Sequence, residues 1–236
     1  MSMISEAATV IQFDLHKSSC RRRELGGTGR VQTLLDRKYA MLSEAPRAVL
    51  RRLGVFAGEF TLQAASAVIA CSRLQRSDVA SGMVELQACS LLDIKNDGAF
   101  SCYFLSQQTR AFALGKLACY KELDLVARNH AGYLQCIFEY AEVELERGDE
   151  PSQWMVHYGR LIEDVRAALD WAFSPSGDAA IGVGLTMAAI PLWLVSLQSD
   201  ELCRRIERAL KSEAAIRTGC DMRLRIAARL AGMSDL

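Results

Sequence analysis

One short segment breaks an otherwise helical sequence and limits the folds that this chain can adopt. Residues 90–105, SLLDIKNDGAFSCYFL, contain two β-like runs on either side of Asn96-Asp97-Gly98. Asp-Gly between two such runs is a strong signal for a β-hairpin. Helical patterns lie before and after it, and helices followed by one hairpin are the order of a winged-helix domain. We therefore expect a winged-helix domain over residues 30–118.

Apolar spacing and capping residues mark the helices of this domain. Gly58 is expected to end the second helix, and Thr61 is a typical N-cap for the third. Ser77 or Asp78 is the expected cap of the helix that precedes the hairpin. We expect helices over residues 31–42, 44–57, 62–70, 79–89 and 106–120.

After Tyr120 the sequence carries only helical patterns, separated by short polar breaks. Such helix pairs are typical of a helical-repeat array. We expect helices over residues 122–148, 152–174, 179–199, 199–215 and 221–233.

The predicted fold class is mainly α: a winged helix, then an all-α array. The array covers residues 119–236 and is expected to be incomplete, because no polar capping repeat is evident. Residues 1–29 include the basic, glycine-rich CRRRELGGTGR and are expected to form a flexible N-terminal segment.

The uncharged run over residues 179–199 is long enough to cross a bilayer, which needs about 20 residues. Its small residues, with Pro191 and Gln198, favour a buried helix of the array instead. We therefore expect no membrane association.

The charge balance excludes a general attraction to nucleic acid, because 28 basic residues match 28 acidic ones. The eight cysteines form no C-x-x-C pattern and are interpreted as reduced core thiols. The N-terminus has no apolar signal-peptide core, so a cytoplasmic location is expected.

Three segments resemble one protein family. LSEAPRAVLRRLGVFAGEFTLQAASAV, QQTRAFALGKLA and VRAALDWAFSPSGDAAIGVGLTMAAIPLWLVSLQSDELCRRIERAL are similar to large bacterial ATP-binding transcriptional regulators of the STAND class, LuxR-type. In that family an NTPase domain is followed by a winged helix and a tetratricopeptide-like sensor array. The resemblance covers residues 30–210 and implies that the array is tetratricopeptide-like.

The sequence departs from that family at its nucleotide site. The phosphate-binding motif G-x-x-x-x-G-K-[ST] is absent, and GGTGR lacks its lysine and hydroxyl. The resemblance therefore implies the control and sensor portion without the motor. A protein partner or a small-molecule signal would bind the helical array, and a separate NTPase chain is a further expected partner.

No pattern of catalytic, cofactor-binding or metal-ligating residues is found. His16, His130 and His157 are scattered and are interpreted as structural or surface residues. Trp154 and Trp193, with Trp171, are interpreted as core residues of the array; a peptide-binding groove is the alternative. We expect no enzyme activity.

DNA binding is the main alternative function. Residues 77–94, which include the helix before the hairpin, carry Asp78, Glu85 and Asp93 but no Lys or Arg, which disfavours a major-groove contact. The cations available for this alternative are Arg47, Arg51, Arg52 and Lys95.

Arg51 and Arg52 are expected on a solvated face or in domain docking rather than on phosphate. The sequence therefore favours a non-enzymatic regulatory or interaction module. Its partner-binding residues stay unknown at this point.

Overall fold

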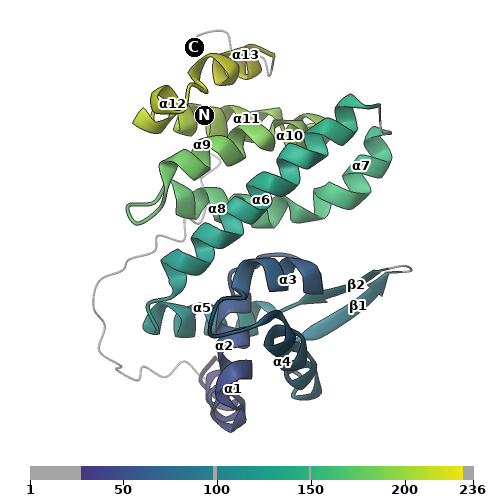
Figure 1. Ribbon diagram of the computed structural model, residues 1–236, viewed down its shortest axis with the longest axis vertical. Coiled ribbons are helices and arrows are strands. Elements are labelled where there is room, and N and C mark those ends of the chain that lie inside the picture. Colours follow the sequence, from purple (N-terminus) through teal and green to yellow (C-terminus); the bar gives the residue numbers. More distant parts are fainter. Residues whose placement is uncertain (1–27, 98–99, 149, 231–236) are drawn as a thin grey trace, which may run out of the picture.

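The computed structural model describes residues 28–97, 100–148 and 150–230. Over these residues the chain is mainly helical, with one small two-stranded antiparallel sheet (Figure 1). The flexible segment predicted over residues 1–29 lies almost wholly outside the described residues, as does His16.

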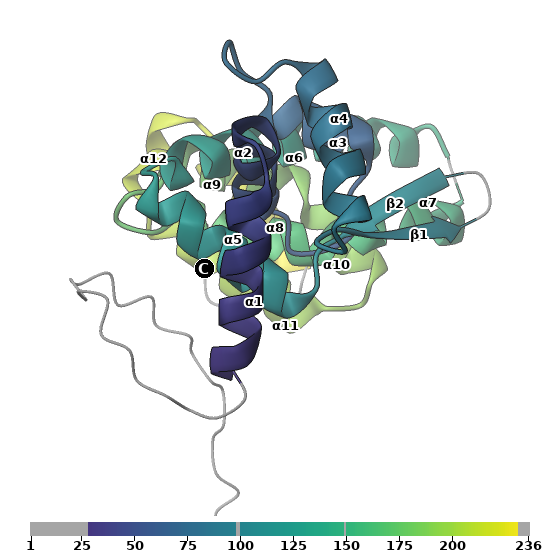
Figure 2. The same cartoon turned by 90° about the horizontal axis from the view of Figure 1, so that it is seen from below.

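The N-terminal half places four helices before the sheet and one after it. Figure 2 shows the hairpin extending on the side of the molecule where the second half carries α7. The elements are α1 (Thr28–Met41), α2 (Glu44–Leu53), α3 (Leu62–Ile69), α4 (Arg76–Ala88), β1 (Asp93–Asp97), β2 (Phe100–Phe104) and α5 (Gln107–Cys119).

The hairpin predicted from the change of period is present. β1 and β2 pair antiparallel, in a register that sets Lys95 opposite Cys102. Gly98, the glycine of the predicted turn, lies outside the described residues. An isolated bridge joins Phe60 to Tyr103, so the sheet is tied to the segment before α3.

Two helix ends differ from the sequence prediction. α2 ends at Leu53 rather than at Gly58, and Gly54, which follows it, lies so close to α5 that an added Cβ would be 2.9 Å from the backbone nitrogen of Leu114. α4 begins at Arg76, and Asp78 accepts a hydrogen bond from the Gln75 nitrogen at 2.8 Å. Asp78 therefore lies inside the first turn of α4.

The cap of α3 agrees with the prediction. Thr61 Oγ1 accepts from the Ala64 nitrogen at 3.1 Å and caps α3. Such side-chain caps satisfy amide groups that have no partner within the helix.

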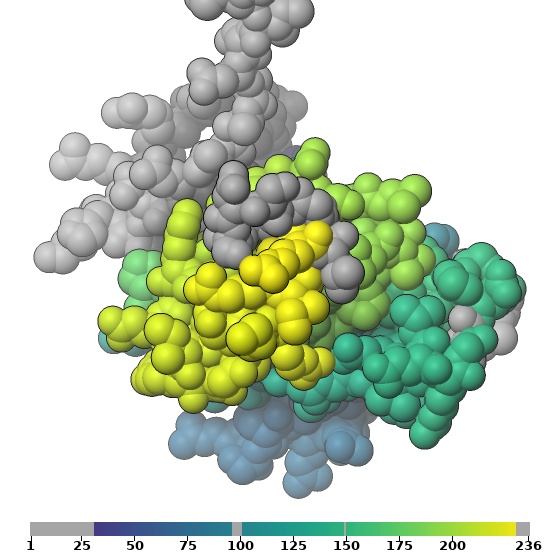
Figure 3. All heavy atoms as spheres, turned by 90° about the horizontal axis from the view of Figure 1, so that it is seen from above, coloured from purple at the N-terminus to yellow at the C-terminus, as the bar shows by residue number. Residues whose placement is uncertain are grey.

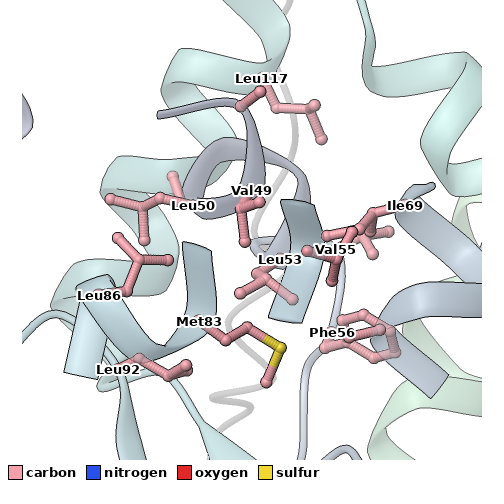
Figure 4. Close-up of a cluster of buried hydrophobic side chains, with 14 of the residues drawn as sticks. Val49, Leu50, Leu53, Val55, Phe56, Ile69, Met83, Leu86, Leu92 and Leu117 are labelled. Carbon is pink, nitrogen blue, oxygen red and sulfur yellow. The ribbon is translucent and has the colours of Figure 1, made fainter. Parts of the chain in front are cut away.

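A buried apolar core joins these elements. Its members come from every helix of the N-terminal half and extend to Ala127. Figure 4 shows part of it, with side chains of α2, α3, α4 and α5 pointing toward one another. α2 runs through its centre, so Val49, Leu50 and Leu53 are fully buried. Gly82 lets α4 approach α2 closely, because a Cβ there would lie 2.9 Å from Val49 Cγ2.

The C-terminal half is all helical in its described residues. Figure 3 shows its last elements at the end of the molecule opposite the N-terminal half. The elements are α6 (Leu123–Glu146), α7 (Pro151–Tyr158), the 3₁₀ turn η1 (Gly159–Leu161), α8 (Ile162–Ala172), α9 (Ala179–Ala188), α10 (Ile190–Val195), α11 (Ser199–Leu210), α12 (Glu213–Arg217) and α13 (Asp221–Leu230).

Three helices predicted as continuous are broken, one of them over residues 199–215, which divide between α11 and α12 at Lys211–Ser212. Residues 152–174 form α7 and α8 with η1 between them, and the break falls at Gly159, a residue of low helix propensity. Residues 179–199 divide between α9 and α10, because Pro191 cannot donate to an existing helix. Among the described helices, none is long and apolar enough to cross a membrane.

A second apolar core runs from Ala131 to Ala228, and its members come from every α-helix between α6 and α13. Trp154 and Trp193 are buried in it, as predicted, whereas Trp171 is half-buried and packs against both cores. The two cores are consistent with two units, and the domain boundary between residues 118 and 119 stays a prediction.

The interpretation of the cysteines as core thiols is wrong for Cys71, Cys119 and Cys136, which are exposed. Cys102 is buried as predicted, and Cys89 and Cys220 are partly buried and pack against the two cores. Cys203 is partly exposed, and Cys20 lies outside the described residues.

Candidate functional site

Two of the four cations considered for DNA binding lie inside the molecule. Arg51 and Arg52 on α2 are only 5% and 9% exposed, which excludes a solvated face. Both bind Glu122, the residue before α6: Arg51 Nε lies 2.8 Å from Oε2, and Arg52 Nη2 lies 2.9 Å from Oε1. This Arg51–Arg52–Glu122 cluster ties the N-terminal half to the first helix of the C-terminal half.

The cluster fixes the charge of its members. Burial alone would raise the pKa of Glu122, but hydrogen bonds from Arg52 and Arg51 lower it to about 2. The hydrogen bond to Glu122 is also the main reason that the pKa of Arg52 is raised. Arg52 Nη1 further donates to the Ile69 carbonyl oxygen at 2.9 Å. The Arg52 guanidinium on α2 therefore contacts both the end of α3 and the residue before α6.

The other two cations are also held by internal contacts. Arg47 Nε donates to the Tyr39 carbonyl oxygen at 2.9 Å, and its guanidinium also contacts the Ala40 carbonyl. Lys95 Nζ on β1 lies 2.9 Å from Glu59 Oε1. The structure therefore brings Arg51 and Arg52 together and leaves Arg47 and Lys95 in separate contacts.

The outer face of α4 is nearly neutral. Its exposed residues include Ser77, Ser81, Glu85 and Val84, the last 68% exposed. Because α4 begins at Arg76, its N-terminus carries one exposed cation that the sequence-based helix boundary left out. Arg73, in the loop before it, is exposed as well.

A pocket of about 150 Å³ lies at the junction of the two halves. The N-terminal half supplies side chains from the segment between α2 and α3 and from α3 itself, and the C-terminal half supplies them from α6, α7, η1 and α8. The lining residues used below are Phe56, Glu59, Phe60, His130, Tyr133, Ile137, Arg160 and Asp164.

A buried carboxylate forms part of the pocket wall. Asp164 on α8 is 1% exposed, and its Oδ1 accepts from the Ala57 nitrogen at 2.7 Å, across the junction. His130 on α6 is equally buried, and its Nε2 lies 3.3 Å from the same Oδ1. Asp164 Oδ2 and His130 Nε2 have no hydrogen-bond partner among the described residues.

Two guanidinium groups lie around this carboxylate. Arg110 on α5 donates from Nε to the Phe56 carbonyl oxygen at 2.7 Å. Burial lowers the pKa of Arg110, and the negative charge of Asp164 counteracts that effect. Arg160 in η1 lines the pocket and places Nη1 3.2 Å from Cys102 Sγ on β2.

No sequence pattern points to a role for Glu122 or Asp164, and His130 is interpreted from the sequence as a structural or surface residue. A sequence signal for Asp164 and His130 exists, because each is a polar residue on the apolar face of its helix. Asp164 shares its face of α8 with Ala168, and His130 shares its face of α6 with Leu134. His157 is exposed on α7 and also lines the pocket.

Among the described residues, no group of three or more His, Cys, Asp or Glu side chains is arranged to hold a metal ion. The polar contacts described above between the two halves are hydrogen bonds and ion pairs.

Three curated mycobacterial proteins are similar to this chain in sequence. They are "Putative HTH-type transcriptional regulator" Rv0890c of Mycobacterium tuberculosis (strain ATCC 25618 / H37Rv), its counterpart MT0914 of strain CDC 1551 / Oshkosh, and Mb0914c of Mycobacterium bovis. Each is 29% identical over 171 residues, which is 71% of this chain and 19% of the relative.

No protein-family profile and no solved structure matches the chain. It spans about a fifth of the length of the curated relatives that it matches. The chain is thus a distant relative of longer proteins that are named as transcriptional regulators.

Proposed function

We propose that this chain is a non-enzymatic regulatory module of a transcriptional regulator. In this proposal a winged-helix unit over residues 30–118 is coupled to a tetratricopeptide-like array over residues 119–236. The module corresponds to the control and sensor portion of a STAND-class regulator and acts through contacts with protein or ligand. Its partners are a protein or small-molecule signal on the array and a separate NTPase chain.

Two observations support the regulatory part of this proposal. The relatives are named as HTH-type transcriptional regulators, although this chain spans about a fifth of their length. The order of the elements, with α2, α3 and α4 before the β1–β2 hairpin, is the order of a winged helix.

The Arg51–Arg52–Glu122 cluster is the observation that favours a function through protein contacts over DNA binding. Phosphate contacts from Lys and Arg dominate the affinity of DNA-binding proteins. Here Arg51 and Arg52 of α2 both form ion pairs with Glu122, and their side chains are only 6% and 11% exposed. Their cations therefore stabilise the junction and are withheld from a phosphate backbone.

The proposal is tested by assaying the purified chain for DNA binding and for ATP hydrolysis. Fluorescence anisotropy with random duplexes at about 0.15 M salt is expected to give no binding tighter than the non-specific range, about 10⁻⁴ to 10⁻⁶ M. ATP turnover is expected to equal that of a buffer control. ATP hydrolysis that co-purifies with the chain would overturn the non-enzymatic assignment.

The second candidate function is a DNA-binding regulator, and exposed cations at the start of α4 favour it. Helix-turn-helix proteins contact base edges with the N-terminal residues of the reading helix, and Arg76 and Arg73 lie there. This candidate predicts duplex binding that weakens steeply with salt and that is lost in an Arg73→Ala/Arg76→Ala variant. Arg37→Ala, at an exposed position of α1, is the matched control.

A further inference from the structure

The junction pocket is not used by the proposed function, and its size indicates a ligand of one aromatic ring. Its volume is about 150 Å³, and an apolar protein cavity of about 150 Å³ accommodates benzene. Phe56 and Phe60 form one wall as a stacked pair with ring centroids 4.5 Å apart. Tyr133 and Ile137 of α6 also line the pocket, so a flat apolar body is well matched.

The polar part of the wall requires a group that can both donate and accept. Asp164 Oδ2 is a carboxylate oxygen, which accepts only, whereas His130 Nε2 donates or accepts according to its tautomer. Both atoms are buried without a partner in the part of the chain that the structure describes. A hydroxyl group donates one hydrogen bond and accepts others, so it satisfies both atoms when His130 carries its proton on Nε2: the hydroxyl donates to Asp164 Oδ2 and accepts from His130 Nε2.

The surrounding charges favour a neutral hydroxyl over an ammonium group. The charge of Asp164 already acts on Arg110, and its Oδ1 accepts the Ala57 amide hydrogen. Arg160 lines the same pocket. A cationic head group would therefore be repelled by the Arg160 guanidinium in the pocket wall, whereas a neutral hydroxyl would not be.

A small movement gives the hydroxyl access. The two unpartnered atoms are covered by neighbouring groups, and a Cβ added to Gly58 would lie 3.2 Å from Asp164 Oδ2. The segment at Gly58 therefore lies close to this oxygen, and binding of a hydroxyl requires this segment to shift.

We propose that the junction pocket binds a small phenol, with the ring beside Phe56 and Phe60 and the hydroxyl donating to Asp164 Oδ2 next to His130 Nε2. The ligand would contact both halves of the molecule at once and so stiffen their junction. This inference goes beyond the proposed function and does not depend on it, because binding is measured directly.

The test compares p-cresol with toluene, which has the same ring and methyl group but no hydroxyl. In isothermal titration calorimetry of the full chain, p-cresol is expected to saturate a single site and to bind about tenfold more tightly than toluene, the effect of one net hydrogen bond. Benzylamine is expected to bind more weakly than p-cresol. Absence of saturable p-cresol binding, equal affinity for toluene, or tighter binding of benzylamine would each overturn the proposal.

Substitutions in and beside the junction pocket test whether p-cresol binds there. Ile137→Phe fills the pocket and is expected to abolish p-cresol binding, whereas Cys136→Phe adds the same ring at an exposed position of α6 and leaves binding unchanged. Asp164→Asn keeps the shape of the side chain but replaces one carboxylate oxygen by a donor, so the preference for p-cresol over toluene is expected to fall. An unchanged preference contradicts the assigned hydroxyl contact.

A measurement on the wild-type chain covers the case in which Ile137→Phe fails to fold. In protein-observed NMR, p-cresol is expected to shift amide resonances near Phe60, His130 and Asp164, three segments that line the pocket. Shifts confined to other regions overturn the site.

Discussion

Two polar clusters cross the junction between the halves, and they differ in how fully their hydrogen-bonding groups are used. In the Arg51–Arg52–Glu122 cluster, both carboxylate oxygens of Glu122 face a guanidinium group. In the Asp164–His130 pair, one carboxylate oxygen accepts from Ala57, and the other has no partner within the described residues. The first cluster is saturated, and the second retains unused capacity.

This difference indicates a structural role for the first cluster and a binding role for the second. A fully satisfied polar network fixes one arrangement of the elements that it joins. A buried polar atom without a partner costs free energy that an added ligand can recover. We therefore expect loss of the first cluster to affect mainly the stability of the junction, and loss of the second to affect both stability and ligand preference.

The largest effect is expected from Glu122→Ala. This change leaves two buried guanidinium groups without their carboxylate, and breaking such a pair costs about 3 kcal/mol of unfolding free energy. Urea denaturation followed by circular dichroism measures the loss. Glu44→Ala is the matched control, because Glu44 contacts the same Arg51 but is 69% exposed, and it is expected to cost about 0.5 kcal/mol. Equal losses in the two variants would show that Glu122 is not the central partner.

Acid should weaken the same cluster in a defined range. The pKa of Glu122 is about 2 in the folded chain and 4.5 ordinarily, so the unfolded chain takes up this proton first as the pH falls. The contribution of Glu122 is therefore complete above about pH 5 and is lost progressively between pH 4.5 and pH 2. The stability difference between wild type and Glu122→Gln is expected to shrink over that range in urea titrations at fixed pH. A constant difference contradicts the lowered pKa.

A smaller effect is expected at Asp164, where two substitutions separate the acceptor from the charge. Asp164→Ala leaves the Ala57 amide hydrogen buried without an acceptor and is expected to cost about 2 kcal/mol. Asp164→Asn keeps an oxygen for that bond, so a loss of about 1 kcal/mol or less is expected. Denaturation curves measure both. Equal costs would indicate that the charge, and not the bond to Ala57, is the stabilising feature.

The local elements of the fold were accessible from the sequence because their signals are local. Apolar spacing and the hydroxyl cap Thr61 mark the start of α3, and the Asp-Gly pair marks the hairpin. Helix breaks were less accessible. The chain leaves α7 at Gly159 and α9 at Ala189, where apolar spacing continues through the break.

The candidate site depends on contacts between distant residues, which local patterns do not encode. Arg51 lies 71 residues from Glu122, and Ala57 lies 107 residues from Asp164. The apolar spacing of α2 indicates that its arginines flank buried leucines, but it does not indicate that the Glu122 carboxylate lies beside them. A polar residue such as Asp164 on an apolar helix face indicates a buried partner without naming it.

The smallest effect is expected from Lys95→Ala, and it separates the two candidate functions. Lys95 is 54% exposed in its contact with Glu59, so its removal is expected to change the unfolding free energy by about 0.5 kcal/mol or less. As the cation of the hairpin, it would contribute to phosphate binding in a DNA-binding regulator, and its loss would lower duplex affinity and reduce the salt slope by about one. In the regulatory module proposed above, anisotropy titrations with duplex DNA are the same for Lys95→Ala and wild type. A clear loss of duplex affinity in this variant would favour the DNA-binding function, because the junction clusters that carry the leading proposal are untouched by the substitution.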